Sequence, residues 1–131
     1  MQTPISYRWF LAHDLTNIRP WYFIDEASRQ SLRDQFNKET GNKCDVYPIA
    51  RRQDCDDAAF FFVRDGKIVD EVIVYHLTYV SDEYLRTTAR LGDASAEWKG
   101  VPFLQWFRDT VLPDIADWIC EEDMPGVLHS C

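Results

Sequence analysis

The middle of the chain carries the hydrophobic pattern of two paired strands. Residues 58–64 read AAFFFVR and are apolar at almost every position, which is typical of a central strand covered on both faces. The next two residues, Asp65 and Gly66, form a dipeptide that favours a two-residue hairpin turn. A second strand is therefore predicted over residues 67–79, in which the acidic pair at 70–71 indicates a bulge or a separate turn.

A third strand is predicted over residues 46–51, shortly before the central one. Pro48 has no backbone N–H to donate, so its presence here indicates a sheet edge or a bulge. Three successive strands with short connections are typical of an antiparallel meander.

A surface helix is predicted before this meander. Asp25 suits the N-cap position because its side chain can accept a backbone N–H, and Gly41 suits the position that ends the helix. Between them Ala27, Leu32 and Phe36 form a thin apolar stripe.

A second helix is predicted near the C-terminus. Pro102 suits its first position, and Pro113 predicts a kink rather than an end, because the apolar spacing continues beyond it. The residues expected to face the core are Leu104, Phe107, Val111, Ile115 and Trp118. A neighbouring face carries Trp106, Thr110, Asp114, Asp117 and Glu121.

Two segments allow less specific predictions. Residues 5–11 suit a short strand or a helical turn, and residues 81–91 suit a short capped helix. Together the elements predict one α+β domain over residues 1–131, with a central, mostly antiparallel sheet and helices packed against it. A chain of this length can bury a core of its own.

The charge balance narrows the class of ligand. The chain has 14 basic and 22 acidic residues and a formal net charge of −8. Nucleic acids and anionic membranes need a basic surface, so both are disfavoured as direct ligands, whereas a basic protein partner would be attracted. Acidity also serves solubility alone, and both interpretations stay open. The N-terminus lacks a signal-peptide pattern and no apolar run is long enough to span a membrane, so we expect a cytoplasmic protein.

Familiar catalytic and metal-binding motifs are absent. The sequence contains no G-x-S-x-G, P-loop, H-E-x-x-H or G-x-G-x-x-G pattern. Cys44, Cys55, Cys120 and Cys131 form no C-x-x-C pair, and no histidine lies at zinc-ligand spacing. In a reducing cytosol all four are expected as thiols. We therefore expect no cofactor, no metal and no catalytic residue.

The most informative segment is the acidic turn, which we define as residues 53–57. Arg51 and Arg52 come shortly before Asp54, Asp56 and Asp57, and the central strand follows. Carboxylates this close repel one another unless cations or backbone N–H groups compensate. Three interpretations follow: a structural turn in which the carboxylates pair with the arginines, an anionic contact for a cationic partner, or a metal site.

The metal interpretation fits the pattern least well. A D-x-D nucleophile pair normally follows a hydrophobic strand directly, but here the polar residues RRQ intervene. The glycine and closing glutamate of a calcium loop are also missing. A metal-dependent phosphoryl or glycosyl enzyme using Asp54 and Asp56 is kept as the alternative. His76 lies in an apolar run, where a histidine is more often a satisfied, half-buried residue than a catalytic base.

Several stretches of the chain together resemble the SUKH superfamily, which includes yeast cell-wall-assembly regulators and bacterial immunity proteins. These stretches are LTN and PWYFI near the N-terminus, YPIARRQD with DDAAF around the acidic turn, the strand end Tyr75-His76, and FLQWF at residues 103–107. The acidic-turn block and the FLQWF helix start are the most specific parts. The resemblance covers about residues 15–118.

This resemblance implies an α+β fold and a non-enzymatic role, in which the protein binds and neutralises a toxin domain from a competing bacterium. The acidic chain suits a basic toxin, and a regulatory scaffold with another protein partner stays open beside it. The superfamily supplies no universal binding residue, so the partner-binding residues are chosen from charge and expected exposure. They are Asp54, Asp56, Asp57, Trp106, Asp114, Asp117 and Glu121.

Overall fold

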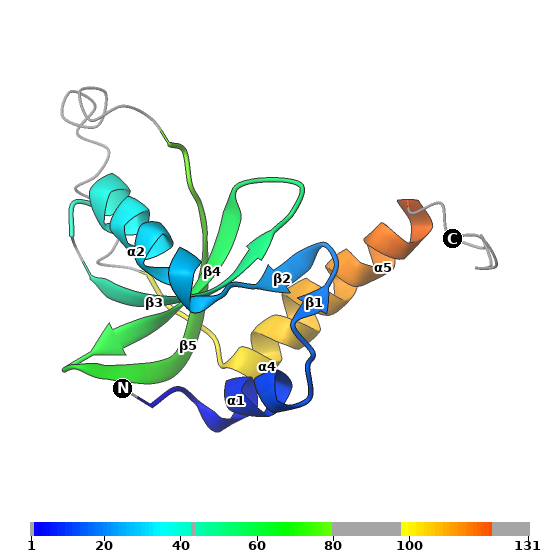
Figure 1. Cartoon of the computed structure of the whole chain (residues 1–131), viewed down its shortest axis with the longest axis horizontal. Helices are drawn as coiled ribbons and strands as arrows, with labels where there is room; N and C mark the ends of the chain where they lie inside the picture. Colours follow the sequence, from blue (N-terminus) through cyan, green and yellow to red (C-terminus); the bar gives the residue numbers. More distant parts are fainter. Residues whose placement is uncertain (1, 43, 80–97, 122–131) are drawn as a thin grey trace.

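The structure, a computed structural model, describes residues 2–42, 44–79 and 98–121. Five strands form one antiparallel sheet in the order β1-β2-β3-β4-β5, with helices on it, which confirms the predicted α+β fold (Figure 1). The elements are α1 (Ile5–Ala12), β1 (Asn17–Ile18), β2 (Trp21–Phe23), α2 (Glu26–Thr40), β3 (Asp45–Arg52), β4 (Asp57–Arg64), β5 (Lys67–His76), α4 (Phe103–Trp106), the π-helical turn η2 (Phe107–Val111) and α5 (Leu112–Glu121).

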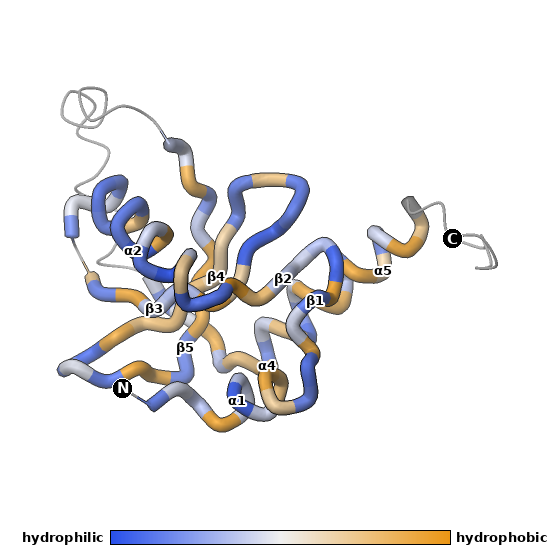
Figure 2. The backbone as a smooth tube through the Cα atoms, in the orientation of Figure 1, coloured by the Kyte–Doolittle hydropathy of each residue, from blue (hydrophilic) through white to orange (hydrophobic). Residues whose placement is uncertain are grey.

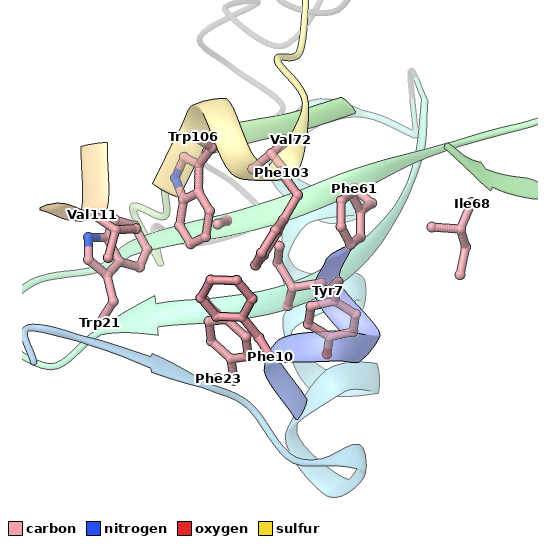
Figure 3. Close-up of a cluster of buried hydrophobic side chains, with 13 residues drawn as sticks. Tyr7, Phe10, Trp21, Phe23, Phe61, Ile68, Val72, Phe103, Trp106 and Val111 are labelled. Atoms are coloured by element: carbon pink, nitrogen blue, oxygen red, sulfur yellow. The ribbon is translucent and has the colours of Figure 1, made fainter. Parts of the chain in front are cut away.

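Helices cover both faces of the sheet. On one face α2 places Leu32 and Phe36 against Phe60 of β4. On the other face α1 and the last helix enclose an aromatic cluster in which Tyr7, Phe61 and other rings meet (Figure 3). Alternate residues of β4 therefore enter two separate cores, and β4 is the central, doubly buried strand that its apolar run predicted.

The hairpin between β4 and β5 forms as predicted. Asp65 and Gly66 have φ of 51° and 73°, the left-handed conformations that a type I′ turn requires. The pairing register shifts where β5 passes residues 70–71, so the expected bulge is confirmed. The strand ends at His76, three residues before the predicted end at 79.

The bulge at Pro48 is confirmed, because the β3–β4 register shifts between Pro48 and Ala50. The predicted sheet edge at Pro48 is confirmed only for part of β3. β3 lies between β2 and β4, but the short β2 pairs only with the stretch of β3 from Ala50 to Arg52. Pro48 lies beyond this pairing, where its missing N–H leaves no ladder bond unmade.

The caps of α2 are confirmed, because Oδ1 of Asp25 accepts the backbone N–H of Ser28 at 2.9 Å and Gly41 ends the helix with φ of 68°. Leu32 is buried as expected, but Ala27 in the first turn is exposed. Figure 2 shows that most residues along α2 are hydrophilic, as expected for a helix with only a thin apolar stripe. Residues 5–11 adopt the helical of the two predicted conformations, as α1.

The last helix runs from α4 through η2 into α5, with Pro102 as its N-cap. Pro113 lacks an N–H and its ring would crowd the carbonyl four residues earlier, and the wider π turn lies directly before it. The predicted core face is largely confirmed, because Val111 is buried and Phe107 and Ile115 pack against the same cluster, but Leu104 is 57% exposed and Phe103 is buried instead. Oδ1 of Asp70 accepts the backbone N–H of Phe103 at 2.8 Å and holds this start against β5.

The predicted helix over residues 81–91 lies outside the described residues. Among the described parts of the chain, no helix has the length and apolar character needed to cross a membrane.

Candidate functional site

The acidic turn is held by ion pairs on its own hairpin. Arg52, the last residue of β3, donates from Nε and Nη2 to the two carboxylate oxygens of Asp54, each at 2.8 Å. This two-pronged contact lowers the pKa of the Asp54 carboxyl and raises that of the Arg52 guanidinium. Asp54 is therefore an ionised structural partner of Arg52 at neutral pH.

The two other acids of the turn also have partners. Nη2 of Arg51 lies 3.3 Å from Oδ1 of Asp56. Nδ1 of His76 lies 2.7 Å from Oδ1 of Asp57, and these two residues are directly opposed on β5 and β4. Each acid is thus matched by a different basic side chain, which removes much of the repulsion that their sequence spacing suggests.

Asp114 connects the turn to the last helix. Its Oδ2 lies 3.0 Å from Nη1 of Arg52 and accepts the indole N–H of Trp21 at 2.9 Å. The Asp114 side chain is only 23% exposed. Asp114 therefore joins β2, β3 and α5, and is not the freely accessible contact residue that the sequence suggested.

The choice of Trp106 as a surface contact is wrong. Its side chain is 2% exposed, and its ring meets that of Trp21 at 82° with centroids 5.3 Å apart (Figure 3). Phe103 and Trp106 both belong to the core cluster between the last helix and the sheet. A residue three positions after a buried residue lies on the same helix face, so this placement follows from the start at Phe103.

The remaining two predicted contacts lie further along α5. Asp117 is exposed, and no hydrogen bond or ion pair reaches it from the described residues. Glu121 is the last residue of α5, and its side chain lies outside the description. The structure therefore brings Asp54, Asp56 and Asp57 together at one end of the sheet, with Asp114 beside them through Arg52.

The chemistry of the turn favours binding over nucleophilic attack. The exposed thiol of Cys55 has a raised pKa, because partial burial and the charges of Asp57 and Asp54 disfavour the thiolate. Asp54 and Asp56 bind separate guanidinium groups, which would compete with a cation for their oxygens. Within the described ranges, no three or more His, Cys, Asp or Glu side chains are placed so that they could hold one metal ion.

Two further cysteines bear on the sequence prediction. Cys44 is a free thiol, whereas Cys120 is disulfide-bonded, so the expectation of four thiols is wrong.

Sequence reasoning missed two partners of the site. Trp21 was not named among the site residues, although its indole N–H needs an acceptor, and that need is the one signal available from sequence. The His76 ring pairs with the Asp57 carboxylate, as expected for a structural histidine. Its side chain, however, is 63% exposed and not half-buried.

The comparisons with known proteins do not identify a relative. No protein-family model, no curated protein and no solved structure matches this chain.

Proposed function

We propose that the chain is a non-enzymatic, cytoplasmic protein-binding domain, and that it acts as an immunity protein that neutralises a basic toxin domain. The observation that carries this proposal is the acidic turn. Its carboxylates are fixed by a hairpin and by ion pairs, yet the side chains of Asp54 and Asp56 remain 36% and 50% exposed. A carboxylate can accept about four hydrogen bonds, so these acids retain capacity for a cationic partner.

Preorganisation supports this role. Arg52 holds Asp54 before any partner arrives, so binding would not have to order that side chain. A net charge of −8 would accelerate encounter with a basic surface. The local ion pairs reduce the field of the turn, and Asp117 on α5 adds an exposed acid that no described residue pairs with.

The resemblance to the SUKH superfamily supports the same role. It implies an α+β scaffold without a shared catalytic site, and the antiparallel sheet with helices on both faces agrees with that scaffold. The metal-dependent alternative is weaker, because Asp54 and Asp56 would each have to release an arginine before a cation could bind both.

The test begins with capture of partners from the lysate and secreted proteins of the source strain, followed by co-expression of each captured domain with the chain. We expect a basic domain that stops growth when expressed alone and permits growth when the chain is present. The double variant Asp56→Asn/Asp117→Asn removes two exposed charges and should weaken this complex about tenfold, mainly through slower association.

The matched control is Asp34→Asn/Asp65→Asn, which removes the same charge from α2 and from the opposite end of the sheet. It should bind like the wild type. Equal weakening by both double variants would show that only net charge matters and that the acidic turn is not the contact. A failure of every captured domain to affect growth would rule out the immunity role.

A further inference from the structure

We infer that a cavity beside β5 binds a small carboxylate that carries an apolar tail. The cavity has a volume of about 300 Å³ and lies between the edge of the sheet and the last helix. We call it the β5-edge cavity. Its walls come from β5, from the segment before α4 and from the last helix, and the lining residues are Val72, Ile73, Val74, Tyr75, Trp98, Lys99, Val101, Trp106 and Thr110.

An unpartnered donor lines this cavity. The indole N–H of Trp106 is buried and makes no hydrogen bond, although the residue is only 2% exposed. Figure 3 shows the ring between helix and sheet, with its nitrogen turned away from Phe103. Buried indole N–H groups normally have an acceptor, and leaving one unpaired is unfavourable. Trp106 lines the cavity, so a ligand bound there lies beside the residue that carries this donor.

The edge of β5 supplies a second donor. Val72 exchanges two backbone hydrogen bonds with Val101, at 2.6 and 3.0 Å, and this isolated bridge is the only pairing on the outer side of β5 among the described residues. Residues two apart in a strand direct their N–H and C=O groups to the same side. The N–H of Val74 therefore points away from β4, beyond the bridge and into the region where the segment carrying Lys99 diverges.

The charge at the cavity favours an anion. Lys99 lines it and is exposed, and no ion pair to Lys99 comes from any residue in the described ranges. No acidic side chain is among the described lining residues. Lys99 therefore lies beside the backbone N–H of Val74 and the indole of Trp106, with no acid among the described lining residues, and this combination is suited to a carboxylate.

The remaining walls define the tail of the ligand. Val72, Val101 and the Trp98 ring are apolar, and Val74 is 42% exposed. A volume near 300 Å³ is at the lower end of small-molecule sites, which suits an acid of about six carbons or the last residues of a peptide. A free acid and a peptide C-terminus share this chemistry.

Gly100 keeps the outer wall of the cavity close to the strand. A Cβ at this position would lie 2.7 Å from Cβ of Glu71 and 2.8 Å from its carbonyl carbon. Only glycine allows residue 100 to lie this close to Glu71 of β5. This close packing lets Val101 form its bridge with Val72, and the cavity opens beside that bridge. The cavity is thus a consequence of how this segment crosses the sheet edge.

The test is a titration of ¹⁵N-labelled protein followed by the indole N–H signal of Trp106, which is assigned through bonds so that no variant at this position is needed. The probes are hexanoate, 1-hexanol, N-acetyl-valyl-leucine and the amide of that dipeptide, at matched ionic strength. We expect a saturable downfield shift with hexanoate or with the dipeptide acid. The neutral partner of each acid should bind about tenfold more weakly, because it lacks the charge-assisted contact.

Two lysine variants provide the control. Lys99→Met keeps the apolar stem and should weaken acid binding about fivefold, whereas Lys67→Met, an exposed lysine of β5 outside the cavity, should bind like the wild type. The acid that binds more tightly identifies the source of the carboxylate. No shift with either acid, equal binding of the neutral probes, or equal binding by both lysine variants would overturn the inference. None of these outcomes bears on the proposed immunity role, which uses a different surface.

Discussion

Arg52 at the end of β3 and Asp114 in α5 form an ion pair with their atoms 3.0 Å apart, and the same carboxylate oxygen accepts the indole N–H of Trp21. One side chain of the last helix thereby fixes two strands and the start of the acidic turn. Asp114 was predicted from its charge to be a contact residue, but its carboxylate links the last helix to the sheet.

Asp114→Ala should lower the free energy of unfolding by about 1–3 kcal/mol, because the N–H of Trp21 loses its acceptor in a mostly buried position. Urea unfolding monitored by circular dichroism measures the change. Asp117→Ala, one turn along the same helix and exposed, should change stability by less than about 0.5 kcal/mol. Equal losses in the two variants would show that helix charge, not the link, is responsible.

Glu39 organises the chain beyond β5 from inside α2, where it is 1% exposed. Its carboxylate accepts the backbone N–H and the hydroxyl of Thr78 at 2.8 and 2.7 Å, and the backbone N–H of Tyr79 at 3.2 Å. Gln35 donates to it as well. In Glu39→Gln an amide NH2 replaces one carboxylate oxygen and faces other hydrogen-bond donors. We therefore expect the variant to be less stable by about 2 kcal/mol.

The effect of this variant should depend on pH. Burial by itself raises the pKa of Glu39, but the hydrogen bonds from Gln35, Thr78 and Tyr79 outweigh it and the pKa ends below its usual value. A lowered folded-state pKa contributes stability above the unfolded-state pKa, about 4.3, and loses it as pH falls through the folded-state value. The stability gap between wild type and Glu39→Gln should be largest at neutral pH and shrink below about pH 4. A gap that is constant with pH would contradict ionised Glu39.

Gly100→Ala should destabilise the protein by about 1–3 kcal/mol, because the new methyl would overlap Glu71 and push the segment off the sheet edge. Thermal unfolding gives the loss in stability, and the backbone amide shifts of Val72 and Val101 report the broken bridge. Gly66→Ala meets no neighbouring atom and is disfavoured only by its φ of 73°. It should leave the amide signals of that bridge in place, and loss of the bridge signals in both variants would refute the steric explanation.

Cys55 should react slowly with iodoacetamide at pH 7 despite its exposure. Its raised pKa means that less thiolate is present than in an unstructured cysteine peptide, and the thiolate is the reactive form. The rate should rise with pH to a midpoint above that of the peptide, and Cys55→Ser identifies the signal by mass spectrometry. A midpoint at or below that of the peptide would indicate an activated thiol and would reopen a catalytic role for the turn.

The local elements were predictable from the sequence because short-range physics decides them. The AAFFFV run, the Asp65-Gly66 turn, the Asp25 cap and the Gly41 stop depend on residues within a few positions of one another. The same holds for the pairing of Asp54 with Arg52, two residues apart, which the structural interpretation of the acidic turn had allowed. The α+β class followed from the order of these elements.

The rest was decided by contacts between residues far apart in the chain. Asp70 of β5 holds the start of the last helix at Phe103, Trp106 is buried beside it, and Asp114 accepts from Trp21, 93 residues away in sequence. Apolar spacing identified the core face at Phe107, Val111 and Ile115, but it did not show that Trp106 and Asp114 beside this face also pack against the sheet. Packing against the sheet requires that apolar side chains are buried and that buried donors have acceptors. Only this requirement decided which acids of the last helix face solvent and which, like Asp114, bind the sheet.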